Sequence, residues 1–85
     1  MSEFRIADNK MQAAAILDAR GLHCPMPLFH TKKEICNLIS GQILQIDGTD
    51  MESRKDFSGW CDRAGHKYLG EKEMHGYISF FIKKG

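Results

Sequence analysis

One segment of the chain, Cys24-Pro25-Met26-Pro27, has residue types and a spacing that suit sulfur chemistry. It places a thiol directly before an amphipathic stretch that is predicted to be a helix. Free backbone amides and the helix dipole stabilise negative charge at a helix N-terminus. We therefore expect Cys24 to be exposed, to titrate below the ~8.5 of a free cysteine and to react as a thiolate nucleophile.

The two prolines limit how that helix can begin. Pro25 suits the first helical position, because it has no amide hydrogen to satisfy and its backbone angle is already helical. Alternatively, Met26 caps the helix and Pro27 is its first residue, since a residue before proline resists helical angles. Both registers leave Cys24 at the mouth of the helix, and the sequence does not choose between them.

The other two cysteines, Cys36 and Cys61, are assigned to packing or to incidental surface. Cys36 follows Ile35 in the predicted helix, and Cys61 follows Trp60 in a later apolar stripe. Three cysteines cannot all pair, and they are too few for the disulfide frameworks of small secreted domains. This cysteine usage indicates a reducing, cytoplasmic compartment.

Six elements are predicted to position Cys24, in the order βαβαββ. This order predicts an α+β fold, a two-layer sandwich in which a mixed four-stranded sheet carries both helices on one face. The periodicity predicts strands at 13–18, 42–47, 67–74 and 77–83, and a helix at 25–39. Ser40-Gly41 ends this first helix, and Gly65-His66 ends a second helix that follows the strand at 42–47. The last two strands are joined across His75-Gly76.

The second helix is predicted to begin with a capping box at 49–52. In this motif the Thr49 hydroxyl and the Glu52 carboxylate satisfy free amides of the first turn. Gly59 is a point where the helix could break. The buried stripe of the helix is predicted to contain Met51, Phe57, Trp60, Cys61 and Ala64.

Length and charge limit the class of protein. The chain has 85 residues with 12 Lys or Arg and 11 Asp or Glu, a formal charge of +1. This length predicts one domain at 13–85 after a flexible N-terminal arm at 1–12. The balanced charge argues against direct nucleic-acid binding, and no apolar run is long enough for membrane insertion. We expect a monomer.

These residues resemble the small bacterial sulfur carriers of the TusA/SirA type, whose hallmark is Cys-Pro-x-Pro at the head of the first helix. Residues 17–27 resemble the opening block of the family, and similar segments continue to Gly85, so the resemblance covers about residues 16–85. The family fold is a βαβαββ sandwich. Met51 stands where the family usually has proline and Lys55 where arginine is frequent, and both differences bear on partner recognition.

The resemblance implies that Cys24 is the reactive residue of a sulfur relay. It would accept sulfane sulfur as a persulfide from a cysteine desulfurase or other sulfur donor protein, and pass it to an acceptor protein. The protein would be a carrier, not an enzyme, and would need no metal or cofactor besides the transient persulfide sulfur on Cys24. The leading example of use is tRNA thiolation, but cofactor assembly, sulfur oxidation, thiosulfate use and selenium metabolism employ similar carriers.

Several residues near the motif are candidates for supporting the thiol or for docking partners. A loop residue beside the thiol is expected to help polarise it, and an aspartate before the second helix is expected either to position the sulfur partner or to cap that helix. Basic residues are expected to form a docking rim or a solvated face. The full set is His23, Pro25, Met26, Pro27, Arg20, Lys32, Lys33 and Asp50.

Two other functional classes stay open from the sequence. A thiol redox or regulatory protein would use Cys24 with Cys61, and would need their α-carbons within about 7 Å. An RNA-binding module follows from fold analogy alone, and the chain lacks interleaved basic and aromatic motifs. The four histidines, at 23, 30, 66 and 75, fit no standard zinc spacing.

Overall fold

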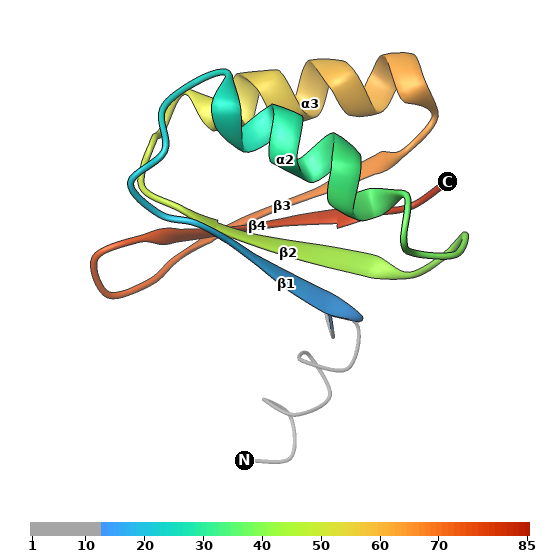
Figure 1. Cartoon of the computed structure of the whole chain (residues 1–85), viewed down its shortest axis with the longest axis horizontal. Coiled ribbons are helices and arrows are strands. Elements are labelled where there is room, and N and C mark those ends of the chain that lie inside the picture. Colours follow the sequence, from blue (N-terminus) through green and yellow to red (C-terminus); the bar gives the residue numbers. More distant parts are fainter. Residues whose placement is uncertain (1–12) are drawn as a thin grey trace.

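The computed structural model describes residues 13–85, and the arm predicted at 1–12 lies outside the described residues. The elements are β1 (Ala15–Ala19), α2 (Met26–Ile35), β2 (Ile43–Gly48), α3 (Ser53–Ala64), β3 (Lys67–Glu73) and β4 (Ile78–Lys83). Both helices cover the same face of one sheet (Figure 1). The predicted α+β class and the βαβαββ order are therefore confirmed. Within residues 13–85, neither helix has the length and apolar character that crossing a membrane requires.

The sheet brings three loops together at one end of its strands. Its strand order is β1-β2-β4-β3, with β1 parallel to β2 and β4 antiparallel to both of its neighbours. A single row of paired residues crosses the sheet near this end, through Ala19, Gly48, Ile78 and Glu73. Because β1, β2 and β3 all end there, the β1–α2 loop, the β2–α3 loop and the β3–β4 turn lie at the same end of the molecule.

The helices are fixed to the sheet by an apolar core. Phe57 of α3 is fully buried, and its ring packs edge-to-face on Phe80 of β4 with centroids 5.1 Å apart. An aromatic pair of this geometry contributes about 0.5–1.5 kcal/mol beyond the burial of its area. Ile35 anchors the end of α2 in the same core cluster, which also contains Leu44 and Ile46 of β2. These contacts fix both helices over the same face of the sheet.

Helix α2 is shorter than its apolar periodicity predicts. It ends at Ile35 with Cys36 as its C-cap, whereas the sequence pattern continues to Ile39. Leu38 is buried, but Ile39 is 69% exposed. The Leu38 carbonyl accepts a hydrogen bond from Nζ of Lys84 at 2.6 Å. A contact from the far end of the chain therefore holds the turn toward β2, and a local pattern cannot reveal it.

The predicted capping box of α3 is wrong. The Thr49 hydroxyl accepts a hydrogen bond from the Gly21 amide at 2.9 Å, so it serves the neighbouring loop. Asp50 takes over the capping role, because its Oδ1 accepts the Glu52 amide at 2.9 Å. Glu52 is itself the N-cap residue and makes no side-chain capping hydrogen bond.

The buried stripe of α3 is only partly as predicted. Phe57, Trp60 and Cys61 are buried, but Ala64 is exposed and Met51 is 49% exposed, because Met51 precedes the helix and faces outward. The helix continues unbroken through Gly59. It ends as predicted at Gly65, which has a φ of 83° and donates its amide to the Cys61 carbonyl at 3.0 Å.

Candidate functional site

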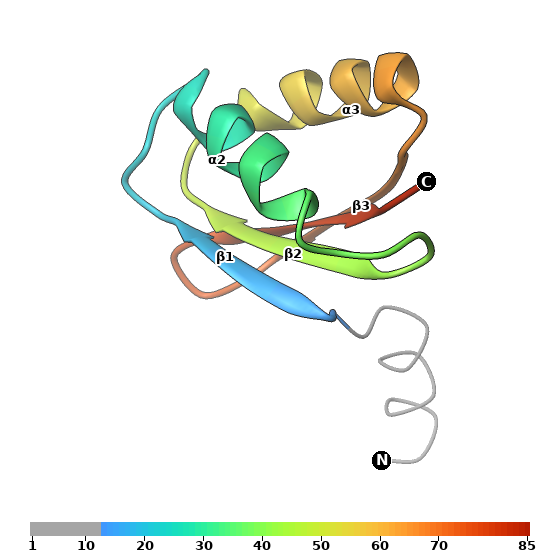
Figure 2. The same ribbon diagram turned by 45° about the vertical axis from the view of Figure 1, so that its right-hand side comes forward.

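Cys24 lies in the β1–α2 loop, where the starts of α2 and α3 are side by side (Figures 1 and 2). Two hydrogen bonds tie this loop to the β2–α3 loop. The Gly21 amide donates to Oγ1 of Thr49 at 2.9 Å, and the Cys24 amide donates to Oδ2 of Asp50 at 2.7 Å. The exposed thiol is therefore held at a defined place between two helix N-termini.

The entry of α2 follows neither of the two registers considered for it. Pro25 is the N-cap, Met26 is the first helical residue and Pro27 is the second. The two prolines have no amide hydrogen, and the Met26 amide donates to the His23 carbonyl at 2.8 Å. The first residues of this helix consequently offer few free amides to a sulfur anion, although helix N-termini usually provide them.

The hydrogen-bond partner of the thiol is Asp56, in the first turn of α3. The Cys24 thiol donates to Oδ2 of Asp56. This hydrogen bond, followed by desolvation and by the negative charges of Asp56, Asp50 and Glu52, raises the pKa of Cys24 to about 11. The prediction that helix amides lower this pKa is therefore wrong, because carboxylates rather than amides surround the sulfur.

Asp50 is the second acidic residue of the site and is fully engaged. Its two oxygens accept the amides of Cys24 and Glu52. These two hydrogen bonds, the Cys24 one first, and the charge of His23 hold the pKa of Asp50 below its usual value. His23 thus contributes its carbonyl to the helix entry and its charge to Asp50, while the thiol itself contacts Asp56.

The basic candidates do not gather around the thiol. Arg20 forms an ion pair with Asp18 at 2.9 Å, and its guanidinium lies 5.6 Å from the centre of the Tyr77 ring. Lys32 and Lys33 are in the last turn of α2, which is ~9 Å along the helix axis from its start. The docking role of these residues stays a prediction, and the charges that act on the Cys24 pKa are those of Asp56, Asp50 and Glu52.

Sequence reasoning missed Asp56 as a member of the site. The available signal was an acidic residue in the first turn of the second helix, a position that helix dipoles favour. That signal says nothing about residue 24, because only the packing of the two helices on one sheet face brings the two side chains together. Thr49 was likewise read as a cap, whereas it ties the Cys24 loop in place.

Three large apolar side chains are exposed in the first turn of α2 and in the β2–α3 loop, the two segments that adjoin Cys24. Met26 is 43% exposed, Phe29 is 52% exposed and Met51 is 49% exposed. Met26 and Phe29 belong to the first turn of α2, and Met51 follows Asp50 directly. We call these three residues the apolar patch. Flexible methionine side chains can adapt to surfaces of different shape.

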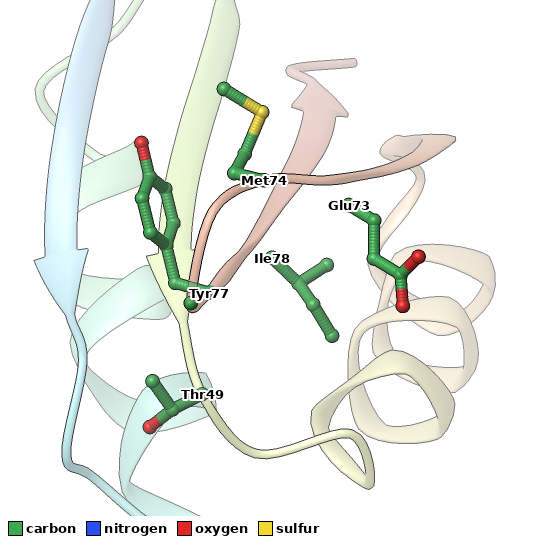
Figure 3. Close-up of a pocket in the computed structure, with 6 residues that line it drawn as sticks. Thr49, Glu73, Met74, Tyr77 and Ile78 are labelled. Carbon is green, nitrogen blue, oxygen red and sulfur yellow. The ribbon is translucent and has the colours of Figure 1, made fainter.

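A shallow hollow of about 270 Å³ lies at the same end of the sheet (Figure 3). It forms between the end of β2 and the β3–β4 turn, and Cys24 is not among its lining residues. Those residues are Thr49, Glu73, Met74, Gly76, Tyr77 and Ile78. Two of its lining residues contact the β1–α2 loop: Thr49 accepts the hydrogen bond from the Gly21 amide, and the centre of the Tyr77 ring lies 5.6 Å from the Arg20 guanidinium.

The other cysteines differ from Cys24 in their surroundings, and all three are free thiols. Cys61 is 1% exposed inside the core and lies ~7.5 Å further along α3 than Asp56. Cys36 is exposed at the end of α2, and its thiol donates to the Lys32 carbonyl at 3.3 Å. In the described part of the chain, no three His, Cys, Asp or Glu residues are grouped so that they could hold a metal ion.

Comparison with known proteins gives the family. The model of the family described as "Sulfurtransferase TusA" matches residues 15–84. The chain belongs to the TusA family. YrkI of Bacillus subtilis is 40% identical over 75 residues, which cover 88% of this chain and 100% of YrkI. The sulfur carrier protein TusA of Allochromatium vinosum is 41% identical over 68 residues, which cover 80% of this chain and 90% of that protein.

Two further matches concern length and fold. YrkF of Bacillus subtilis is 41% identical over 75 residues, but the matched region spans only 40% of YrkF. The crystal structure of a SirA-like protein from Desulfitobacterium hafniense superposes with a TM-score of 0.67 at 26% identity, covering 84% of this chain and 97% of that one. The TusA family match and the SirA-like fold together support a sulfur carrier function in a relay.

Proposed function

We propose that the protein carries sulfur as a persulfide on Cys24, which it accepts from a donor protein and passes to an acceptor protein. The observation that carries this proposal is the position of the thiol. Among the three cysteines, Cys24 alone is exposed on a loop that hydrogen bonds fix between two helix starts. A thiol held at the surface in this way can meet the sulfur of a second protein without entering a pocket.

The donor and acceptor supply the rest of the reaction site. A persulfide transfer needs a nucleophilic thiol and a donor sulfur, and it needs neither metal nor cofactor. The protein then acts as a carrier and not as an enzyme with its own substrate chamber. A cysteine desulfurase is the proposed donor, tRNA thiolation is the leading example of use, and the cytoplasm is the proposed compartment.

Partner proteins would dock on the apolar patch around the thiol. Exposed aromatic and methionine side chains of this kind are enriched at protein interfaces. Arg20, Lys32 and Lys33 remain candidates for an outer docking region, since charges at the rim of an interface mainly affect the rate of association. The acidic site beside the thiol would favour a basic surface on the partner.

Replacing Cys24 with serine tests the proposal. We expect the Cys24→Ser protein to gain no sulfur after incubation with a cysteine desulfurase and L-cysteine, when its intact mass is measured. The control carries Cys36→Ser and Cys61→Ala, and we expect it to gain sulfur. Alanine is used at position 61 because a buried serine hydroxyl there would need a new hydrogen-bond partner. Equal loading of the Cys24→Ser protein would refute the assignment.

A further inference from the structure

We infer that Asp56 is the general base of sulfur transfer, taking the Cys24 thiol proton as the sulfur–sulfur bond forms and returning it to the leaving thiolate. This inference rests on the proposed function, because it requires Cys24 to be the residue that carries the sulfur. It adds a second participant to the reaction, on a helix far from Cys24 in the sequence.

The geometry singles out Asp56 among the three nearby acids. Its Oδ2 accepts the hydrogen bond of the thiol, so the proton already points at it. Asp50 has both oxygens engaged with backbone amides. Glu52 acts on the thiol through its charge and lies 3.9 Å from Nζ of Lys55. Asp56 alone therefore has a carboxylate oxygen in contact with the reacting group.

The position of Asp56 is rigid enough for this role. It is half-buried in the first turn of α3, directly before Phe57, which is fully buried against Phe80. Asp50 fixes the other side of the contact by holding the Cys24 amide. Both the proton donor and its acceptor are thus positioned by core packing and backbone hydrogen bonds, a condition for efficient proton transfer.

A base is needed because the thiolate itself is scarce. The hydrogen bond to Asp56 is the largest cause that raises the Cys24 pKa to about 11, so the thiol keeps its proton at pH 7 until the attack. The two prolines and the engaged Met26 amide leave the helix entry unable to offset this. A neighbouring carboxylate that takes the proton during the attack removes the need to form the free thiolate first.

The transfer balances without any further reactant. Cys24 Sγ attacks the outer sulfur of a donor persulfide R–S–SH while its proton passes to Oδ2 of Asp56. The new Sγ–S bond forms, the donor S–S bond breaks, and its electron pair leaves with the donor as R–S⁻. Asp56 then protonates this thiolate. The sum is Cys24–SH + R–S–SH → Cys24–S–SH + R–SH, and discharge to an acceptor thiol is the same reaction in reverse.

Two rates measured on Asp56→Asn distinguish proton transfer from a simple charge effect. All variants carry Cys36→Ser and Cys61→Ala, so that Cys24 is the only thiol. The first rate is alkylation by iodoacetamide, in which iodide leaves and needs no proton. The second is sulfur uptake from glutathione persulfide, followed by intact mass, in which the leaving thiolate must gain a proton. Using a small persulfide keeps partner docking out of the measurement.

We expect the two rates to move in opposite directions. Loss of the carboxylate lowers the Cys24 pKa. Alkylation at neutral pH should then become about tenfold faster for each unit by which this pKa falls. Sulfur uptake should become slower by about tenfold or more. Uptake by the unsubstituted site should change little between about pH 6 and pH 9, whereas uptake by Asp56→Asn should rise with pH as the thiolate forms.

Two matched variants complete the test. Glu52→Gln removes a nearby charge without touching the thiol, and we expect slightly faster alkylation and unchanged sulfur uptake. Asp56→Glu keeps a carboxylate, and we expect it to recover part of the uptake that Asp56→Asn loses. Circular dichroism shows whether each variant is folded, and the pH profile of the unsubstituted site tests the inference even if Asp56→Asn does not fold.

Three results would overturn the inference. These are faster uptake in Asp56→Asn, equal slowing in Glu52→Gln, or an uptake by the unsubstituted site that rises with pH as thiolate formation does. The first and third results would leave Asp56 as a group that only suppresses ionisation, and the second would show that the effect is not specific to the carboxylate in contact with the thiol. A different result, no sulfur on Cys24 from either glutathione persulfide or a desulfurase, would refute the proposed function instead.

Discussion

At the scale of single residues, the position of the Cys24 thiol depends on Asp50. Its carboxylate bridges two loops, since Oδ2 accepts the Cys24 amide at 2.7 Å and Oδ1 accepts the Glu52 amide at 2.9 Å. Both hydrogen bonds favour the ionised carboxylate, and so the folded state holds its pKa below the usual value. The same side chain therefore caps the start of α3 and fixes the backbone next to the thiol.

The pH dependence of stability tests this role of Asp50. A carboxylate with a depressed pKa in the folded state stabilises the fold above the unfolded pKa of about 3.9, and this contribution is lost as the pH falls through the folded value. We expect Asp50→Ala to lower the urea midpoint at pH 7. The difference between the two proteins should shrink steadily below about pH 4. A difference that is independent of pH would mean that the charge of Asp50 does not contribute.

The sequence predicted Cys24 as a candidate site residue but did not predict its contact with Asp56. Cys24 was found because its signal is local, consisting of a cysteine followed by prolines at the start of a helix. Its pKa was predicted in the wrong direction, because the prolines that mark the site also remove the amides that would stabilise a thiolate. Asp56 was out of reach, since no spacing rule connects positions 24 and 56.

At the scale of elements, α3 contains two glycines with opposite roles. Gly65 ends the helix in the left-handed region at a φ of 83°, where a side chain meets no neighbour within 4 Å but strains the backbone. Gly59 lies inside the helix, where its backbone freedom only opposes folding. A Cβ at position 59 would lie 3.3 Å from Nη1 of Arg63, the mobile end of a flexible side chain.

Alanine at each of these positions should change stability in opposite directions. We expect Gly65→Ala to lower the free energy of unfolding by about 1 kcal/mol, because alanine is strained at positive φ. We expect Gly59→Ala to raise it by about 0.5–1 kcal/mol, provided that Arg63 moves aside. Urea unfolding measures both. A loss of stability in Gly59→Ala would show that Arg63 is held in place.

The types and order of the elements followed from periodicity, but their ends did not. The apolar spacing that identified α2 continues to Ile39, yet the helix stops at Ile35, and Lys84 binds the carbonyl of Leu38 in the turn that follows. At the start of α3, the hydroxyl of Thr49 accepts a hydrogen bond from the Gly21 amide instead of from a helix amide. In both cases a partner distant in sequence competes with the local pattern, and only the folded chain supplies it.

At the scale of the whole molecule, the fold gathers the residues of the candidate site at one end of the sheet. The parallel pair β1 and β2 brings two helix starts together there, and the apolar patch of Met26, Phe29 and Met51 flanks Cys24. Under the proposed function, Cys24 both receives sulfur and releases it. Donor and acceptor therefore use overlapping parts of one surface and bind in turn, which requires a patch that suits more than one partner.

Truncating the apolar patch should separate partner docking from sulfur chemistry. The variant carries Phe29→Ala and Met51→Ala, which remove two large exposed side chains without touching Cys24 or Asp56. We expect loading by a cysteine desulfurase to slow by about tenfold or more, since exposed aromatic anchors contribute strongly to protein interfaces. Loading by glutathione persulfide should be unchanged, because this small donor makes no use of the patch.

The matched control for this variant is Ile39→Ala. Ile39 is 69% exposed, and it lies beyond the other end of α2, so its removal tests whether any exposed apolar side chain has the same effect. We expect both donors to load this control at the original rates. If the patch variant slowed both donors equally, the substitutions would have disturbed the thiol itself. If it slowed neither, docking would not depend on this patch, and charge reversal at Arg20, Lys32 and Lys33 would be the next measurement.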